Sequence, residues 1–118
     1  MDVNTQNQAL LLRLLDASAK RRDVLLGNLA NSVTPGYQRK TVRFEELLRD
    51  AVSSGRDPLS VEPLVEVDKL APAGDDGNSV SLELELGGLR ENRLLYETYT
   101  AILGTRLEIQ RAAIDSGR

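Results

Sequence analysis

The chain has 118 residues, enough for one ordinary domain, and its formal net charge is −3. It lacks both cysteine and histidine, which excludes disulfides, thiolate metal sites and catalytic triads built on histidine. The remaining composition is 41% hydrophobic but only 3% aromatic, which favours helices packed lengthwise, and we expect no catalytic residue, cofactor, metal, small-molecule substrate or nucleic-acid partner.

The N-terminal segment predicts a helix over residues 4–33. Apolar residues recur every three or four positions, Leu15, Leu26 and Leu29 among them, and leave one broad apolar face. A residue that precedes a proline avoids the helical region, so the helix should end before Pro35. The first residues lack the positive charge and the apolar run of a secretory signal, so if the protein leaves the cytoplasm, we expect a route without a cleaved leader.

A turn follows this helix. Pro35 and Gly36 fit the second and third positions of a type II turn, in which glycine adopts a positive φ. Asn28 and Asn31 are three residues apart and project from one face of the helix. Two explanations for these asparagines remain open: either Asn31 stabilises the helix end, or both are buried in a helical interface and set its register.

The sequence predicts turn and loop over residues 34–79. Residues 51–88 carry 2 basic and 8 acidic side chains and include three of the four prolines, which exclude a long helix there. We expect residues 53–79 to be irregular, with at most short extended pieces. The basic clusters at residues 20–22 and 39–40 are interpreted as solvated surface, because acidic residues lie close by.

The C-terminal segment predicts a helix over residues 80–115, although its beginning has two interpretations. Apolar residues alternate with serine and glutamate over residues 80–86, which is typical of a strand. Ser81 could equally cap a helix whose first turn is acidic. The glycine pair at 87–88 weakens a continuous helix by roughly 1 kcal/mol per glycine. Further along the helix an apolar stripe contains Leu95, Tyr99, Ile102 and Ile109.

Together these elements predict a mainly α fold with a single unit spanning residues 1–118. Its two long terminal amphipathic helices should pack as a coiled-coil-like hairpin, joined by a mostly irregular acidic loop. The packing residues, mainly buried in the assembly, should be Leu15, Leu26, Leu29, Leu95, Ile102 and Ile109, with Tyr99 in the same stripe. Since isolated helices are marginally stable, we expect the isolated chain to be partly disordered, especially at both ends.

The stretch NLANSVTPGY resembles the N-terminal signature of the flagellar axial proteins, the rod and hook family. The matching residues are Asn28, Leu29, Ala30, Asn31, Thr34, Pro35, Gly36 and Tyr37. The C-terminal stretch, from GNSVSLELEL to EIQRAAI, resembles the C-terminal helix of proximal rod members of that family. The resemblance covers about residues 8–50 and 77–115.

The resemblance implies a structural protein and not an enzyme. It implies a proximal rod in the periplasm that joins the membrane ring of the flagellar basal body to the distal rod and hook and transmits torque. The implied partners are copies of the chain, other rod proteins, the membrane-ring and rod-adaptor proteins, and the flagellar type III export apparatus. The signature residues would then contact neighbouring subunits. Two alternatives are another axial rod protein and a small helical export chaperone.

Overall fold

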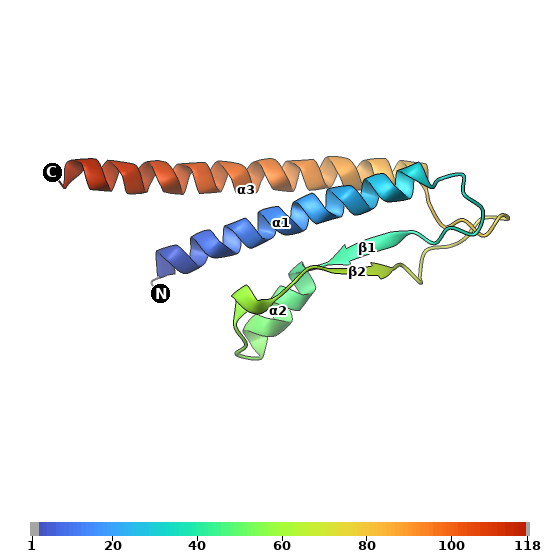
Figure 1. Cartoon of the computed structure of the whole chain (residues 1–118), viewed down its shortest axis with the longest axis horizontal. Coiled ribbons are helices and arrows are strands. Elements are labelled where there is room, and N and C mark those ends of the chain that lie inside the picture. The colour runs from blue at the N-terminus through green and yellow to red at the C-terminus, as the bar shows by residue number, and fades with distance from the viewer. Residues whose placement is uncertain (1–2, 118) are drawn as a thin grey trace.

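The computed structural model describes residues 3–117 of the chain (Figure 1). The elements follow in the order α1 (Val3–Ala30), β1 (Lys40–Arg43), α2 (Glu45–Ser53), the 3-10 turn η1 (Pro58–Ser60), β2 (Leu64–Val67) and α3 (Leu82–Ser116). The molecule measures 67 × 30 × 14 Å. Its radius of gyration is 18.2 Å, against about 13.5 Å for a compact chain of this length, so the molecule is a rod and not a globule.

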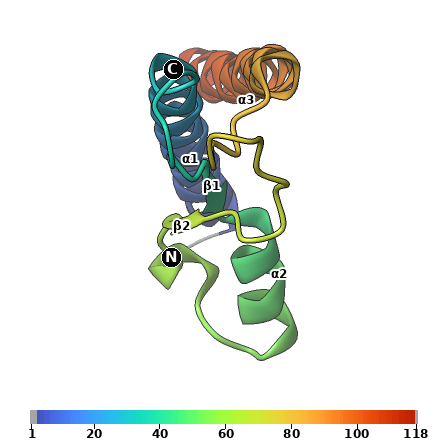
Figure 2. The ribbon, with the colours of Figure 1, turned by 90° about the vertical axis from the view of Figure 1, so that its right-hand side faces the viewer.

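The two long helices run antiparallel, as predicted, and meet at the end where α1 stops and α3 begins, here called the turn end (Figure 1). Towards the opposite end, the free end, the helices diverge. Viewed from the turn end, α1 and α3 lie side by side above a lobe that contains β1, α2, η1 and β2 (Figure 2). Among the described residues beyond position 92, none is buried, so the predicted hairpin packing holds for only part of α3.

The beginning of α3 settles the two sequence interpretations in favour of a helix. The Ser81 hydroxyl accepts a hydrogen bond from the Leu84 N–H at 3.4 Å and caps the helix, so the strand interpretation was wrong. The helix continues unbroken through the glycine pair. A Cβ atom on Gly88 would lie 3.2 Å from Leu25 Cδ2, so glycine at this position allows α3 to approach α1 closely.

The prediction of turn and loop over residues 34–79 was wrong for β1 and α2, whereas β2 is one of the short extended pieces expected within residues 53–79. Strands β1 and β2 pair antiparallel, with Lys40 opposite Val67 and Arg43 opposite Leu64, and α2 follows β1 directly. Phe44 has no exposed surface and lies between β1 and α2. Both the strands and α2 are too short to be stable alone. Strand β1 packs on α1 and pairs with β2, and α2 contacts η1, which also packs on α1. Because these contacts come from other parts of the chain, the short elements need little apolar periodicity in their own sequences.

Candidate functional site

The turn after α1 forms as its sequence predicts. The Tyr37 N–H donates to the Thr34 carbonyl at 3.2 Å, and Gly36 has a φ of +75°, which confirms the prediction of a positive φ. The helix itself ends at Ala30, before the predicted limit at residue 33. The Asn31 side-chain amide donates to a carbonyl of the last turn of α1 at 2.9 Å, which favours the helix-end explanation for this residue.

A second loop, which contains Asn78, contacts this turn. Asn78 is 7% exposed, and its amide nitrogen donates to the carbonyls of Asn31 and Thr34, each at 2.8 Å. A Cβ atom on the preceding Gly77 would lie 3.4 Å from Gly36 Cα, so two glycine-containing turns touch at this point. The end of α1 is thereby held against the segment that leads into α3.

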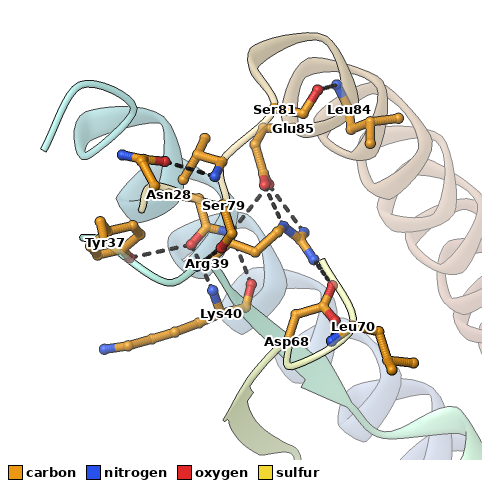
Figure 3. Close-up of polar contacts among 12 residues, drawn as sticks. Asn28, Tyr37, Arg39, Lys40, Asp68, Leu70, Ser79, Ser81, Leu84 and Glu85 are labelled. Atoms are coloured by element: carbon orange, nitrogen blue, oxygen red, sulfur yellow. Dashed lines mark hydrogen bonds and ion pairs between the residues drawn. The ribbon is translucent and has the colours of Figure 1, made fainter. Parts of the chain in front are cut away.

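Asn28 is the centre of a buried polar network near the turn end (Figure 3). Its amide nitrogen donates to the Lys40 carbonyl at 2.8 Å and to Glu85 Oε2 at 3.1 Å. Its amide oxygen accepts from the Lys40 N–H at 2.9 Å and from the Tyr37 hydroxyl at 3.3 Å. The side chain is 0% exposed and fully satisfied, so Asn28 fixes register within the chain. The expectation that it faces a neighbouring subunit is therefore corrected.

The charged part of this network joins three segments that are distant in the sequence (Figure 3). Arg39 Nε donates to Glu85 Oε1 at 2.6 Å, and another guanidinium nitrogen donates to Asp68 Oδ2 at 2.6 Å. The side chain of Glu85 is 0% exposed and that of Arg39 is 20% exposed. The hydrogen bond with Glu85 raises the pKa of Arg39 above its ordinary value, and burial opposes this effect. The interpretation of Arg39 as solvated surface was therefore wrong.

A similar correction applies to Arg21 of the other basic cluster. Its guanidinium donates to Glu45 Oε2 at 2.7 Å, and its side chain is only 19% exposed. The pair lies in a groove between α1, α3 and the lobe that Tyr99 also lines. Burial raises the pKa of the Tyr99 phenol above its ordinary value of 10.0, and the nearby Glu45 carboxylate raises it further.

The predicted packing residues divide into two groups. Leu15, Leu29, Leu95 and Tyr99 are half-buried in the single chain. Leu26, Ile102 and Ile109 are 48%, 41% and 64% exposed. Of the signature residues, Ala30, Thr34, Pro35 and Gly36 are exposed, while Asn31 and Tyr37 are half-buried. The burial of the exposed group by neighbouring subunits stays a prediction.

Sequence reasoning missed the polar residues that face inward. Asn92 is 5% exposed and donates to the Ser18 carbonyl at 2.8 Å, and Ser18 is 1% exposed. On α3, the missed residues could have been identified from the predicted apolar stripe that contains Leu95 and Tyr99. Continued towards the helix start at steps of three and four, it passes through Asn92, Gly88 and Glu85. On α1, the same spacing links Ser18 to Arg21, Leu25 and Asn28.

The polar network around Asn28 and Arg39 connects elements of the same chain. The polar side chains of Asn28, Arg39 and Glu85 form hydrogen bonds within the chain. No group of three acidic side chains within residues 3–117 is arranged to hold a metal ion. No helix in the described part of the chain has both the length and the apolar character required to span a membrane. The network therefore serves to fix the lobe to both long helices.

Comparison with known proteins points to one family. No model of a protein family matches the chain. The chain is 38% identical to the flagellar basal body rod protein FlgB of Aquifex aeolicus, over 68% of this chain and 69% of that protein. It is 29% identical to the FlgB of Escherichia coli, over 95% of this chain and 91% of that protein. The FlgB of Yersinia enterocolitica is 28% identical, with 95% and 92% covered.

Proposed function

Because this chain belongs to the FlgB family of flagellar basal body rod proteins, a family of structural proteins, we propose that it builds the proximal part of the rod. In this role it joins the membrane ring to the distal rod and hook and transmits torque between them. Its partners are copies of itself, other rod proteins, and the membrane-ring and rod-adaptor proteins. It reaches them through the flagellar type III export apparatus.

The observation that carries this proposal is an apolar surface that the chain leaves uncovered. The inward faces of the long helices contain buried polar side chains, whereas large apolar side chains are exposed on their outer surfaces. On α1, Leu12 and Leu26 are 52% and 48% exposed, and on α3, Tyr96 and Leu107 are 46% and 51% exposed. Exposed apolar side chains at helical spacing along a 67 Å molecule favour lengthwise packing against other helices.

The buried network supports a role in which load passes through the subunit. Torque reaches the lobe only if the lobe cannot rotate against the helices. Arg39, directly before β1, bonds to Glu85 on α3 and to Asp68 directly after β2, and Asn28 connects α1 to the same group. Buried charge-assisted hydrogen bonds are directional, so they resist displacement of one element against another.

The exposed signature residues are proposed as contacts between subunits. Thr34, Pro35 and Gly36 form a fixed turn at the turn end, and their outer surfaces are free in the single chain. Because Asn78 holds this turn from inside, its shape does not depend on a neighbour. A rigid exposed turn suits a contact that must be repeated along a helical assembly.

Two experiments test the proposed function. The chain should be found in purified flagellar basal bodies, and its absence from them would refute the rod assignment. Ile102 of α3 is 41% exposed in the single chain. If neighbouring subunits bury it, Ile102→Asp should abolish swimming, because a buried carboxylate costs several kcal/mol. Thr98→Asp, at an exposed position of the same helix, is the matched control and should swim normally. Normal swimming of the Ile102→Asp strain would exclude this surface from the interface.

A further inference from the structure

A groove lies along the contact between the two long helices. It has a volume of about 350 Å³ and is lined by Ser18, Ala19, Arg22 and Leu26 of α1 and by Leu89, Asn92, Arg93 and Tyr96 of α3. No described residue of the lobe lines it, in contrast to the groove on the other flank that contains Tyr99. Its walls belong to the uncovered apolar faces of both helices.

Two arginines interrupt the apolar walls of this groove. Arg22 is 60% exposed and its carboxylate partner is the adjacent Asp23, at 3.5 Å. Arg93 is 81% exposed and contacts Glu97, four residues away, at 3.0 Å. Exposed pairs of this kind contribute at most about 1 kcal/mol, so both guanidinium groups are available to another carboxylate. An occupant of the groove should therefore be apolar and acidic together.

The floor of the groove carries a second indication of an occupant. Ser18 Oγ and Asn92 Oδ1 are buried and have no hydrogen-bond partner within the chain. An unsatisfied buried polar atom costs about 1–3 kcal/mol, and native structures contain few. Rotation of either side chain would present its oxygen to a polar group that the occupant brings.

The same chain carries a segment with the required chemistry. The loop of residues 69–76 extends past the ends of the helices at the turn end (Figure 1). Leu70, near its start, is 95% exposed, which is unusual for a leucine outside an interface. Asp75 and Asp76, at its end, are also exposed. This loop lies in the acidic part of the sequence, where residues 51–88 carry 8 acidic and only 2 basic side chains.

We propose that the loop of residues 69–76 of one copy docks into the groove of a second copy. Leu70 would contact the apolar walls, and the two aspartates would face Arg22 and Arg93. The contact joins two different surfaces, so it is heterologous and leads to an open chain of subunits instead of a closed dimer. The proposal deepens the proposed function, since it names a contact between copies in the rod.

Cross-linking tests this contact without a flagellum, because the chain contains no native cysteine. Purified full-length Leu26→Cys and Leu70→Cys chains would be mixed at high concentration and oxidised. The mixture should give a disulfide-linked dimer, while either variant alone should not. Val52→Cys is the matched control, because Val52 is an apolar side chain of the lobe that is 62% exposed but lies outside the loop. Equal yields with Val52→Cys and Leu70→Cys would overturn the proposal.

Charge reversal provides a second measurement on the same mixture. Arg22→Glu in the Leu26→Cys chain should lower the initial cross-linking rate about two- to fivefold, as expected for loss of one exposed ion pair. Asp75→Arg in the Leu70→Cys chain should restore the rate. An unchanged rate, or no restoration, would show that the aspartates do not face the arginines.

The outcomes separate this proposal from the function on which it rests. If the chain is present in basal bodies but Leu26→Cys cross-links to Leu107→Cys on α3 and not to Leu70→Cys, the groove holds a neighbouring helix and the loop proposal is wrong. If the cross-link forms but the chain is absent from basal bodies, the contact stands and the rod assignment fails.

Discussion

Replacement of Glu85 by glutamine tests whether the buried network stabilises the fold. Glu85 accepts hydrogen bonds from Arg39 Nε at 2.6 Å, from a second Arg39 nitrogen at 3.3 Å and from Asn28 Nδ2 at 3.1 Å. Glutamine has the same shape but carries no charge, and its amide nitrogen would face one of these donors. The variant therefore removes the charge and creates a donor–donor contact without leaving a cavity.

The expected cost follows from what Arg39 retains. Removal of one partner from a fully buried ion pair costs about 3–5 kcal/mol. Arg39 keeps Asp68 at 2.6 Å, and its side chain is 20% exposed, so part of that cost is recovered. We expect Glu85→Gln to lower the free energy of unfolding by about 2–3 kcal/mol. This is a large share of the roughly 5–15 kcal/mol that stabilises a typical domain.

Urea unfolding of the purified chain, followed by circular dichroism, measures this loss. With a slope of about 1–3 kcal/mol per molar urea, the midpoint should fall by about 1 M or more. Glu83→Gln is the matched control, because Glu83 is exposed in the same first turn of α3 and loses the same charge. It should change stability by no more than about 0.5 kcal/mol. Equal midpoints for the two variants would refute the reasoning.

Three further predictions concern backbone geometry and order. Gly36→Val forces a β-branched residue to a φ of +75°, at a cost of about 1–2 kcal/mol, and should reduce incorporation into basal bodies more than the amount exported; equal losses would contradict this. Gly87→Ala should raise the melting temperature, because a Cβ atom at this position meets nothing within 4 Å. Gly88→Val should lower the melting temperature, because a Cβ atom there would lie 3.2 Å from Leu25 Cδ2. A higher melting temperature for Gly88→Val would be inconsistent with this close approach. Amides of residues 100–116 should exchange rapidly in the dilute chain and become protected on assembly, and protection in the dilute chain would count against ordering by neighbours.

The features that the sequence predicted correctly depend on local chemistry. Apolar periodicity is a property of each helix alone, so it indicated both long helices. The conformation at Pro35 and Gly36 follows from ring geometry and from the absence of a side chain, and the structure has the predicted turn. The Ser81 cap was one of two open interpretations, because the alternation that follows it is equally compatible with a strand.

The lobe shows where local chemistry was insufficient. Strand β1 has four residues, and its outer edge is bonded by side chains of α1, with Asn28 contacting both backbone groups of Lys40. The partner strand β2 pairs with it from a point more than twenty residues further along the chain. No window of sequence contains these contacts, so the strands do not show up as a periodic pattern.

Which face of each long helix turns inward depends on contacts between distant parts of the chain. Apolar periodicity alone would bury Leu26, yet the inward face of α1 contains Ser18, Arg21 and Asn28, and Leu26 is 48% exposed. Burial of a polar side chain is favourable only if hydrogen-bond partners meet it, and Asn28 finds one in Glu85, 57 residues away. Formation of the two long helices could be predicted from the sequence, because it depends on neighbours along the chain. The choice of face depends on partners that folding brings together.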